Sequence, residues 1–191
     1  FSHDGKMLAS GSSDSTVKIW DVDSNRELSY LSGHAGWINS VRFSPDGRSI
    51  TSASSDTTVG TWDSMSGRPI RFLRGHSSSV RCADYCSSGK LIASGGRDNA
   101  LKIWDITTGK CVQTLQEHNG WVLCVDMSPR GSLLASGATD CMIRVNDIEL
   151  GKRVYDLKGH EDSVRDVHFS PNGQVLASSS VDSTIKLWDL N

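Results

Sequence analysis

The sequence contains few cysteines, four prolines, 7% aromatic residues and no excess of charge of either sign. It also lacks any stretch approaching the roughly 18 apolar residues that a membrane-spanning helix needs, so membrane insertion is not expected. A net charge of −2 with 22% charged residues offers neither a broad basic surface for nucleic acid nor an acidic tail. We therefore expect an ordinary globular domain that is long enough to bury a core.

The cysteines are odd in number and irregular in spacing. They are Cys82, Cys86, Cys111, Cys124 and Cys141. Neither a disulfide framework nor a paired zinc site has this pattern. Reduced thiols are typical of the cell interior, so we expect an intracellular protein, cytoplasmic or nuclear, with no metal and no cofactor.

What the sequence has instead is a repeat of 42 residues. Its marker is the dipeptide Trp-Asp, found at Trp20-Asp21, Trp62-Asp63, Trp104-Asp105 and Trp188-Asp189, with Asn146-Asp147 in the one remaining slot. A histidine lies 28 residues before each of the last four slots, and a serine and an aspartate lie ten and six residues before every slot. For those four slots the landmark residues are His34, Ser52, Asp56 and Trp62; His76, Ser94, Asp98 and Trp104; His118, Ser136 and Asp140; and His160, Ser178, Asp182 and Trp188.

With these landmarks the chain resembles the WD40 repeat family, also called Trp-Asp or beta-transducin-like repeats. The resemblance implies an all-β fold: a WD40 β-propeller arc of about five four-stranded antiparallel blades, with incomplete terminal blades, belonging to a seven-blade ring. The expected blades span approximately 1–32 (partial), 33–74, 75–116, 117–158 and 159–191 (partial). A ring of seven such units needs about 290 residues, so we expect an arc of a longer protein.

Both terminal blades are expected to lack a strand. The segment from Phe1 to Gly5 matches the one from Phe43 to Gly47, which follows an innermost strand, and Asn191 comes directly after a third strand. Inside the second unit, residues 38–43 alternate between apolar and polar as a half-buried strand does. We expect further strands over 49–53 and 58–62 and an outer one that ends near residue 73.

The recurring histidine, serine and aspartate have the residue types of a catalytic triad. A hydrolase needs one exposed nucleophile, whereas here each of four units carries the set, so we expect no enzyme activity. The resemblance implies a buried hydrogen-bond chain in which the Trp indole N–H donates to Ser, the Ser hydroxyl to His, and His to Asp. A buried Trp N–H does require an acceptor, which Ser supplies.

The fourth unit departs from this pattern, because Asn146 replaces the tryptophan and Glu117 stands where other units have glycine before the histidine. We expect Asn146 to hydrogen-bond to Ser136 and to leave much of the indole volume unfilled. This blade should then be the softest, and loss of Asp140 should cost less stability than loss of Asp98.

The resemblance implies that partners bind on the face that carries the Gly-His loops. The residues expected there are Trp37, Asn39, Arg81, Arg97, Trp121, Leu123 and Arg165. Tryptophan and arginine are enriched at the centres of interfaces. The alternative for the two tryptophans is that each folds over its own glycine-containing loop, at Gly36 and Gly120.

We expect a non-catalytic scaffold or adaptor for protein–protein interaction within a multiprotein complex. Because indole and guanidinium groups share this face, its preferred ligand should be an acidic or phosphorylated peptide with an apolar anchor. The alternative is an RNA or other nucleic-acid reader that uses the same Trp and Arg side chains. Salt-dependent RNA binding would separate the two, although the near-neutral charge gives nucleic acid little to bind.

Overall fold

The computed structural model describes all 191 residues and contains eighteen strands and no helix, arranged in five antiparallel sheets. We number the sheets 1 to 5 in chain order. Their strands are β1 (Met7–Gly11), β2 (Val17–Asp21) and β3 (Glu27–Leu31) in sheet 1; β4 (Ile38–Phe43), β5 (Ser49–Ser54), β6 (Thr58–Asp63) and β7 (Pro69–Arg74) in sheet 2; β8 (Val80–Tyr85), β9 (Leu91–Gly96), β10 (Leu101–Asp105) and β11 (Cys111–Leu115) in sheet 3; β12 (Val122–Met127), β13 (Leu133–Ala138), β14 (Ile143–Asp147) and β15 (Lys152–Leu157) in sheet 4; and β16 (Val164–Phe169), β17 (Val175–Ser180) and β18 (Ile185–Asp189) in sheet 5.

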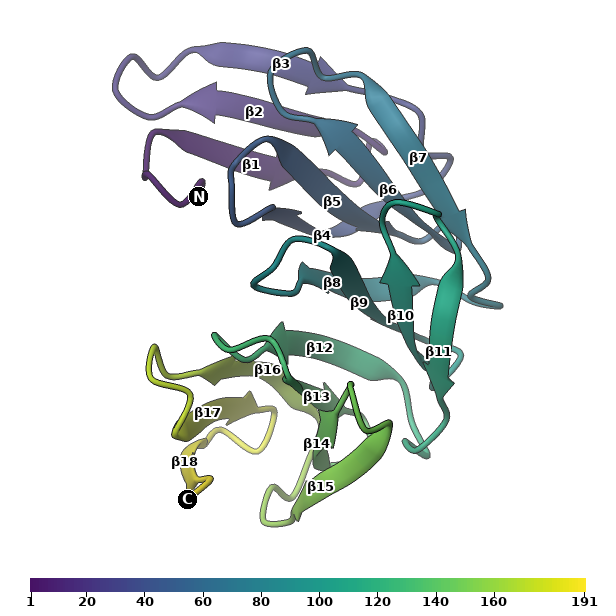
Figure 1. The fold of residues 1–191 in the computed structure, drawn as a ribbon, viewed down its shortest axis with the longest axis vertical. Helices are drawn as coiled ribbons and strands as arrows, with labels where there is room; N and C mark the ends of the chain where they lie inside the picture. Colours follow the sequence, from purple (N-terminus) through teal and green to yellow (C-terminus); the bar gives the residue numbers. More distant parts are fainter.

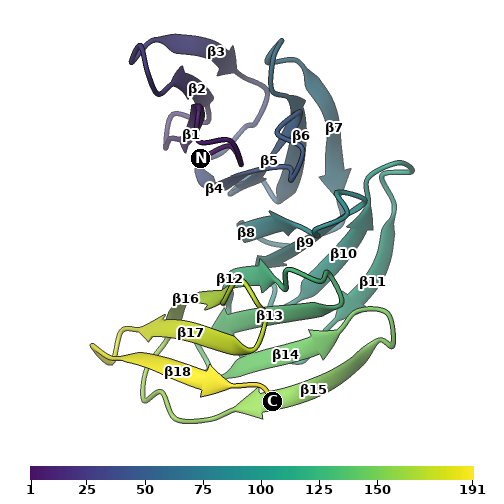
Figure 2. The ribbon, with the colours of Figure 1, turned by 60° about the vertical axis from the view of Figure 1, so that its left-hand side comes forward.

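The sheets follow one another along an arc that does not close (Figure 1). Strands β4, β8, β12 and β16 line its inner side, and β3, β7, β11 and β15 lie at its periphery. The two chain ends lie at opposite ends of the arc (Figure 2). The predicted all-β arc of about five blades, with three strands in the first and last, is therefore confirmed.

Tight turns join consecutive strands, as between β4 and β5. Gly47 has a φ of 71°, which glycine adopts without steric cost, and its N–H donates to the Ser44 carbonyl over 2.9 Å. The Ser44 hydroxyl donates to the Asp46 carboxylate over 2.6 Å. Local side-chain bonds of this kind fix where each strand ends and the next begins.

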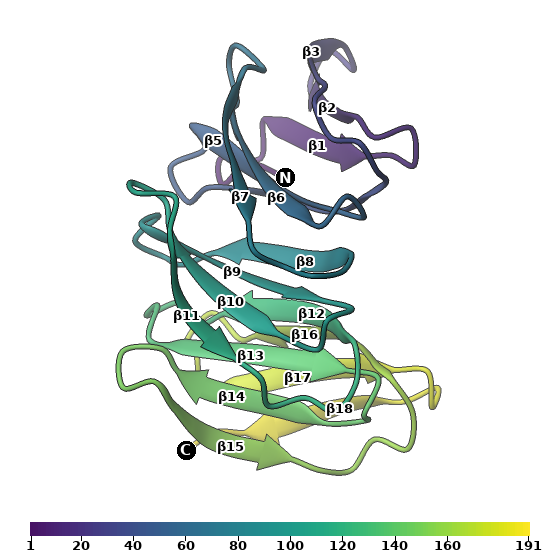
Figure 3. The ribbon, with the colours of Figure 1, turned by 90° about the vertical axis from the view of Figure 1, so that its right-hand side faces the viewer.

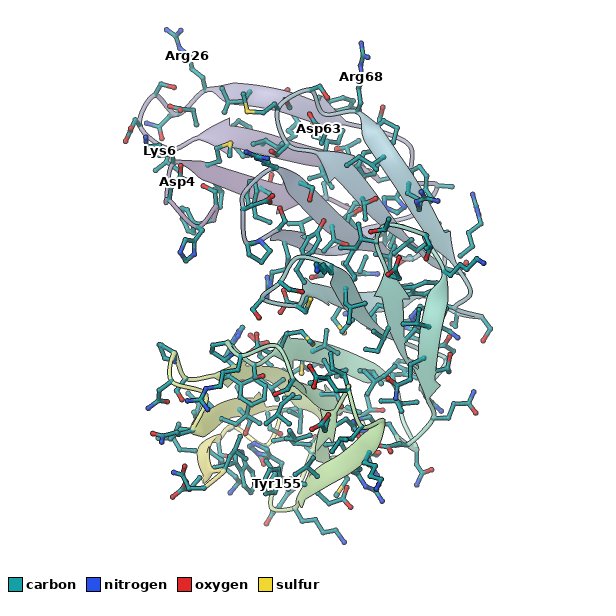
Figure 4. All side chains as sticks on the ribbon, viewed as in Figure 1. Asp4, Lys6, Arg26, Asp63, Arg68 and Tyr155 are labelled. Carbon is teal, nitrogen blue, oxygen red and sulfur yellow. The ribbon has the colours of Figure 1, made fainter.

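The hydrophobic core lies between neighbouring sheets, which stack face to face (Figure 3). Trp104 is fully buried and packs in one cluster with Val59 and Leu73 of the preceding sheet. At the C-terminal end, the Tyr155 hydroxyl donates to the Leu190 carbonyl over 2.9 Å (Figure 4). All five cysteines are free thiols. The structure holds no helix capable of crossing a membrane.

Candidate functional site

The histidine, serine, aspartate and tryptophan of sheet 2 meet in one hydrogen-bonded chain. Trp62 Nε1 donates to Ser52 Oγ over 2.8 Å, and Ser52 Oγ lies 2.8 Å from His34 Nε2. His34 Nδ1 lies 2.7 Å from Asp56 Oδ2. Sheet 3 repeats this chain with Trp104, Ser94, His76 and Asp98, and each of its three successive contacts is 2.8 Å long. Sheet 5 repeats it with Trp188, Ser178, His160 and Asp182, with Trp–Ser, Ser–His and His–Asp distances of 2.9, 2.7 and 2.7 Å.

The polar atoms of these chains are hydrogen-bonded to one another and largely buried. Burial opposes the charge on Asp56, but hydrogen bonds from the Thr58 hydroxyl, the Ala35 N–H and His34 outweigh it and lower the pKa of Asp56 to about 2. Burial also lowers the pKa of His34. Ser52 is fully buried beneath them, with no surface for a substrate to reach. Saturated polar networks of this kind fix one conformation of the loops that they join.

The chain in sheet 4 differs, and the predicted bond from Asn146 to Ser136 is wrong. Both polar side-chain atoms of Asn146 are buried and have no hydrogen-bond partner. Ser136 Oγ is engaged elsewhere: it lies 2.9 Å from His118 Nε2 and donates to the Arg144 carbonyl over 3.4 Å. Sheet 4 also holds an ionic group, because Arg144 is buried and its Nη1 reaches Asp140 Oδ2 over 2.9 Å and His118 Nδ1 over 2.6 Å. The expected softness of this sheet stays a prediction.

The glycine-containing loops press against the turns that carry the aspartates. A Cβ added to Gly36 would lie 2.8 Å from the Asp56 nitrogen, and one added to Gly120 would lie 2.9 Å from the Asp140 nitrogen. The tryptophans that follow point outward, with exposures of 63% for Trp37 and 45% for Trp121. The glycines thus serve the loop contact itself.

A β-bulge occurs at the same point of every complete innermost strand. Each pairing register skips one residue, between Ile38 and Ser40, Val80 and Cys82, Val122 and Cys124, and Val164 and Asp166. The residues skipped are Asn39, Arg81, Leu123 and Arg165, four of the predicted partner-binding residues. A bulge re-aims a side chain out of the sheet alternation, and bulges are over-represented next to functional sites.

These four residues, which we call the bulge cluster, line one open cavity of about 410 Å³ on the inner side of the arc. Arg42 also lines the cavity, and its walls include small and apolar residues, among them Ala83 and Val125. Within the cluster, Arg81 Nη1 donates to Asn39 Oδ1 over 3.1 Å, and Asn39 Nδ2 donates to the Val80 carbonyl over 2.7 Å. These hydrogen bonds hold Arg81 and Asn39 in place.

Trp121 and Arg97 form a stacked pair next to sheet 4's first strand. The guanidinium carbon of Arg97 lies 4.5 Å from the centre of the Trp121 ring, a cation–π contact between neighbouring sheets. Trp37 neither lines the cavity nor takes part in such a stack. The structure thus brings four predicted residues into one cavity and two into a stacked pair, and leaves Trp37 apart.

The arginines of this region have no carboxylate partner. Neither Arg81, Arg97 nor Arg165 takes part in any of the ion pairs of the structure. Burial lowers the pKa of Arg81, and the positive charges of Arg97 and Arg165 add to the effect. Other arginines, such as Arg26 and Arg68, point into solvent at the outer edge (Figure 4). Arg81 and Arg165 thus line the cavity without a direct ion pair, although Asp166 also lines it.

Sequence reasoning missed a second row of charged residues on the same strands. It consists of Arg42, Asp84, Asp126 and His168, which recur at the 42-residue interval. Their signal was available, but it is a recurrence of charge and not of one residue type. The Met127 N–H donates to Asp84 Oδ2 over 3.3 Å, so the row joins adjacent sheets.

Two members of this row have strongly shifted pKa values. Burial raises the pKa of Asp84 to about 6, and the negative charge of Asp126 adds to the shift. Hydrogen bonds to Asp126 and Asp166 raise the pKa of His168 to about 10. His168 Nδ1 lies 3.4 Å from Asp126 Oδ1, and its Nε2 lies 3.2 Å from Asp166 Oδ2.

Comparison with known proteins identifies the repeats. The family described as WD domain, G-beta repeat, matches residues 1–21, 25–63, 67–105, 109–147 and 151–189. Nuclear distribution protein PAC1-2 of Postia placenta is 54% identical over 39 residues, which are 20% of this chain and 9% of that protein. The human U5 small nuclear ribonucleoprotein 40 kDa protein is 51% identical over 43 residues, 22% of this chain and 12% of that protein.

Proposed function

This chain belongs to the WD40 repeat family, and we propose that it is a non-catalytic scaffold that binds a peptide or protein domain on the face that carries the bulge cluster. The observation that carries the proposal is the convergence of four bulged residues on one open cavity. Four separate strands each deform their pairing at this point, which costs ladder hydrogen bonds and is typical of a site that serves a ligand.

The chemistry of this face favours an acidic or phosphorylated segment with an apolar anchor. Arg81, Arg97 and Arg165 have no acidic partner, and guanidinium groups bind carboxylate and phosphate groups through paired hydrogen bonds. The exposed edge of Trp121 and the side chain of Leu123 offer apolar contact at small entropic cost. Trp37 would contact only a partner large enough to extend beyond the cavity.

The absence of catalysis is part of the proposal. The only recurring set with the residue types of a nucleophilic triad is buried, and its serine hydroxyls are engaged by tryptophan and histidine. A nucleophile needs an approach path for its substrate, and none of these serines has one.

A place in an intracellular multiprotein complex, cytoplasmic or nuclear, completes the proposal. Single-repeat matches to a protein named for nuclear distribution and to one named for a small nuclear ribonucleoprotein support it. The free thiols agree with a reducing compartment.

The nucleic-acid alternative is disfavoured by the stacked pair. Arg97 covers one face of the Trp121 ring, the surface on which a base would stack. With a net charge of −2, the chain also has little electrostatic attraction for a phosphate backbone. Measurable, salt-dependent RNA binding that is lost in Trp121→Ala would favour this alternative over the scaffold.

Affinity capture with the full-length protein tests the proposal. The face variant carries Trp121→Ala and Arg165→Ala, and the control carries Tyr30→Ala and Arg68→Ala, an exposed aromatic and an exposed arginine at the outer edge. Each face substitution should weaken partner binding by about 1–3 kcal/mol, while the control should bind as the parent does. Equal retention of partners by both variants would place the binding surface elsewhere.

A further inference from the structure

Sheet 4 differs from the other sheets at two positions that face each other. In sheets 3 and 5, a Cβ added to the glycine before the histidine would lie 3.1 Å from Trp104 Cη2 and 3.2 Å from Trp188 Cη2. The indole thus leaves little room for a side chain at that position, and the positive φ of these glycines, 154° and 159°, disfavours one as well. In sheet 4 the tryptophan is replaced by Asn146, and the glycine is replaced by Glu117. The loss of the indole makes room for a side chain at the glycine position, which couples the two replacements sterically.

A third residue that differs, Arg144, lies on the same strand two residues before Asn146. Its counterpart in sheet 2 is Gly60, where an added Cβ would lie 2.7 Å from His34 Nε2 and 2.8 Å from Trp62 Nε1. A side chain from this position therefore begins beside the hydrogen-bonded chain. In sheet 3, which keeps its tryptophan, the counterpart Lys102 turns outward to Thr114 Oγ1 over 3.0 Å. Arg144 turns inward instead and is buried.

All the buried unpartnered side-chain atoms in the structure belong to these three residues. They are Glu117 Oε2, Arg144 Nε, Asn146 Nδ2 and Asn146 Oδ1. In the sheets that keep their tryptophan, the indole N–H and the serine satisfy each other. The apolar ring in sheet 4 has therefore been exchanged for a polar group of residues.

The direction of the hydrogen bonds in a tryptophan-containing sheet follows from the indole and the aspartate. Trp62 Nε1 can only donate, so Ser52 Oγ accepts from it; the Asp56 carboxylate can only accept, which leaves His34 Nε2 to accept the Ser52 proton. The His34 ring proton then resides on Nδ1 and donates to Asp56 over 2.7 Å. The same reasoning holds in sheets 3 and 5.

In sheet 4 the donor stands at the opposite end. Arg144 Nη1 lies 2.6 Å from His118 Nδ1, and a guanidinium cannot accept, so Nδ1 must accept. The ring proton of a neutral His118 then resides on Nε2 and donates to Ser136 Oγ over 2.9 Å. Ser136, which receives no indole N–H, donates to the Arg144 carbonyl over 3.4 Å.

One further distance agrees with this reversal. His118 Nδ1 lies 3.1 Å from both Asp140 oxygens, whereas the shortest such distance is 2.7 or 2.8 Å in the other three sheets. The ring is neutral in either tautomer, since burial lowers the pKa of His118 as it lowers that of His34.

We propose that Arg144, together with Glu117 and Asn146, replaces the core tryptophan as one unit and reverses the hydrogen-bond chain, so that His118 carries its proton on Nε2 while His34, His76 and His160 carry theirs on Nδ1. Arg144 is a positioning residue. Its Nη1 donates to Asp140 and holds that carboxylate in place. Asp140 in turn accepts, over 2.9 Å, the N–H of Asn119, which lies in the loop that leads to Trp121.

The tautomers can be read from long-range proton–nitrogen correlation spectra of the ¹⁵N-labelled full chain at neutral pH, because protonated and unprotonated ring nitrogens have different shifts. His118 should show an unprotonated Nδ1, and His76 in the same molecule should show an unprotonated Nε2. Arg144→Met removes the donor at similar length and should return His118 to the His76 pattern. A His118 pattern equal to that of His76 in the parent would overturn the proposal.

The coupling of the three residues is tested by restoring the tryptophan. Asn146→Trp alone should lower the Tm by at least about 4 °C, because the indole meets Glu117 and Arg144. Glu117→Gly and Arg144→Lys added to it should recover the Tm and give His118 the His76 tautomer. An Asn146→Trp variant that is as stable as this triple variant would overturn the coupling, and the triple variant keeps the tautomer test available if Arg144→Met does not fold.

Discussion

Replacing the aspartate of sheet 4 should destabilise the protein at least as much as replacing that of sheet 3, the reverse of the ranking expected from the sequence. Asp98 and Asp140 are similarly buried, with side-chain exposures of 7% and 11%. Asp98→Ala removes the partner of His76 and the acceptor of the Ser77 and Ala100 N–H groups, at a cost of about 2–4 kcal/mol. Asp140→Ala removes the acceptor of the Asn119 and Met142 N–H groups and also strips Arg144 of its closest carboxylate.

The extra cost arises from the guanidinium that remains. The Arg144 side chain is 9% exposed. The other carboxylate near it belongs to Asp156, whose Oδ1 lies 3.5 Å from Arg144 Nε and whose side chain is 36% exposed. Removing one partner of a buried ion pair costs about 3–5 kcal/mol, because the other charge stays buried. We therefore expect about 3–5 kcal/mol for Asp140→Ala.

Equilibrium unfolding in urea measures both variants and the double variant Asp140→Ala/Arg144→Met. The double variant should regain at least about 1 kcal/mol over Asp140→Ala, since it removes the stranded charge. The reasoning is refuted if Asp140→Ala costs clearly less than Asp98→Ala, or if the double variant is no more stable than Asp140→Ala.

Three further predictions concern pH, a loop contact and the rim. The pKa of Asp84 is raised to about 6 in the folded state, above its unfolded value near 4. Its contribution to the free energy of unfolding should therefore be most favourable below pH 4 and should be lost as the pH rises through 6. Asp84→Asn should stabilise the protein at pH 7.5 by about 2 kcal/mol, seen as a raised Tm, and should flatten this part of the pH profile. Gly36→Ala should cost about 1–3 kcal/mol in denaturant melts, since its Cβ would lie 2.8 Å from the Asp56 nitrogen, and a neutral effect would show that the loop is not held against the turn. Trp121→Ala should leave the melting curve within about 0.5 kcal/mol of the parent, whereas a large loss would make the exposed indole structural.

The strands of this fold are accessible to sequence reasoning because each depends on local alternation and local turns. The innermost strand over 38–43 is observed with the bounds that the alternation predicts. The buried chain of His34, Ser52 and Trp62 follows equally well, since the need of an indole N–H for an acceptor does not depend on long-range geometry.

Arg144 was beyond reach for a physical reason. Three other units carry lysine at its position, namely Lys18, Lys102 and Lys186, so a basic residue there gives no signal. Its inward turn depends on the space vacated by a side chain two residues away on the same strand. The usable signal was the joint departure of Glu117 and Asn146. That these two positions lie together is visible only in the structure, where the loop glycine of sheet 3, Gly75, approaches Trp104.

The candidate site, like the fold, could be predicted from the sequence only in part. That Arg81 and Arg165 would lie on one face follows from the repeat, but the bulges that turn them toward a shared cavity were not predicted. Their signal is the three-residue step from Ile38 to Val41, where strict alternation would place apolar residues two apart. The stack of Arg97 on Trp121 depends on the spacing between two sheets, which no local pattern contains.

The most direct test of the proposed scaffold is a hydrogen–deuterium exchange footprint of the full-length protein with and without a captured partner. The account predicts slowed exchange in the loops before the innermost strands, over residues 77–82, 119–124 and 161–166, with little change in β3, β7, β11 and β15. Protection confined to those outer strands, with the inner loops exchanging as they do in the free protein, would contradict it.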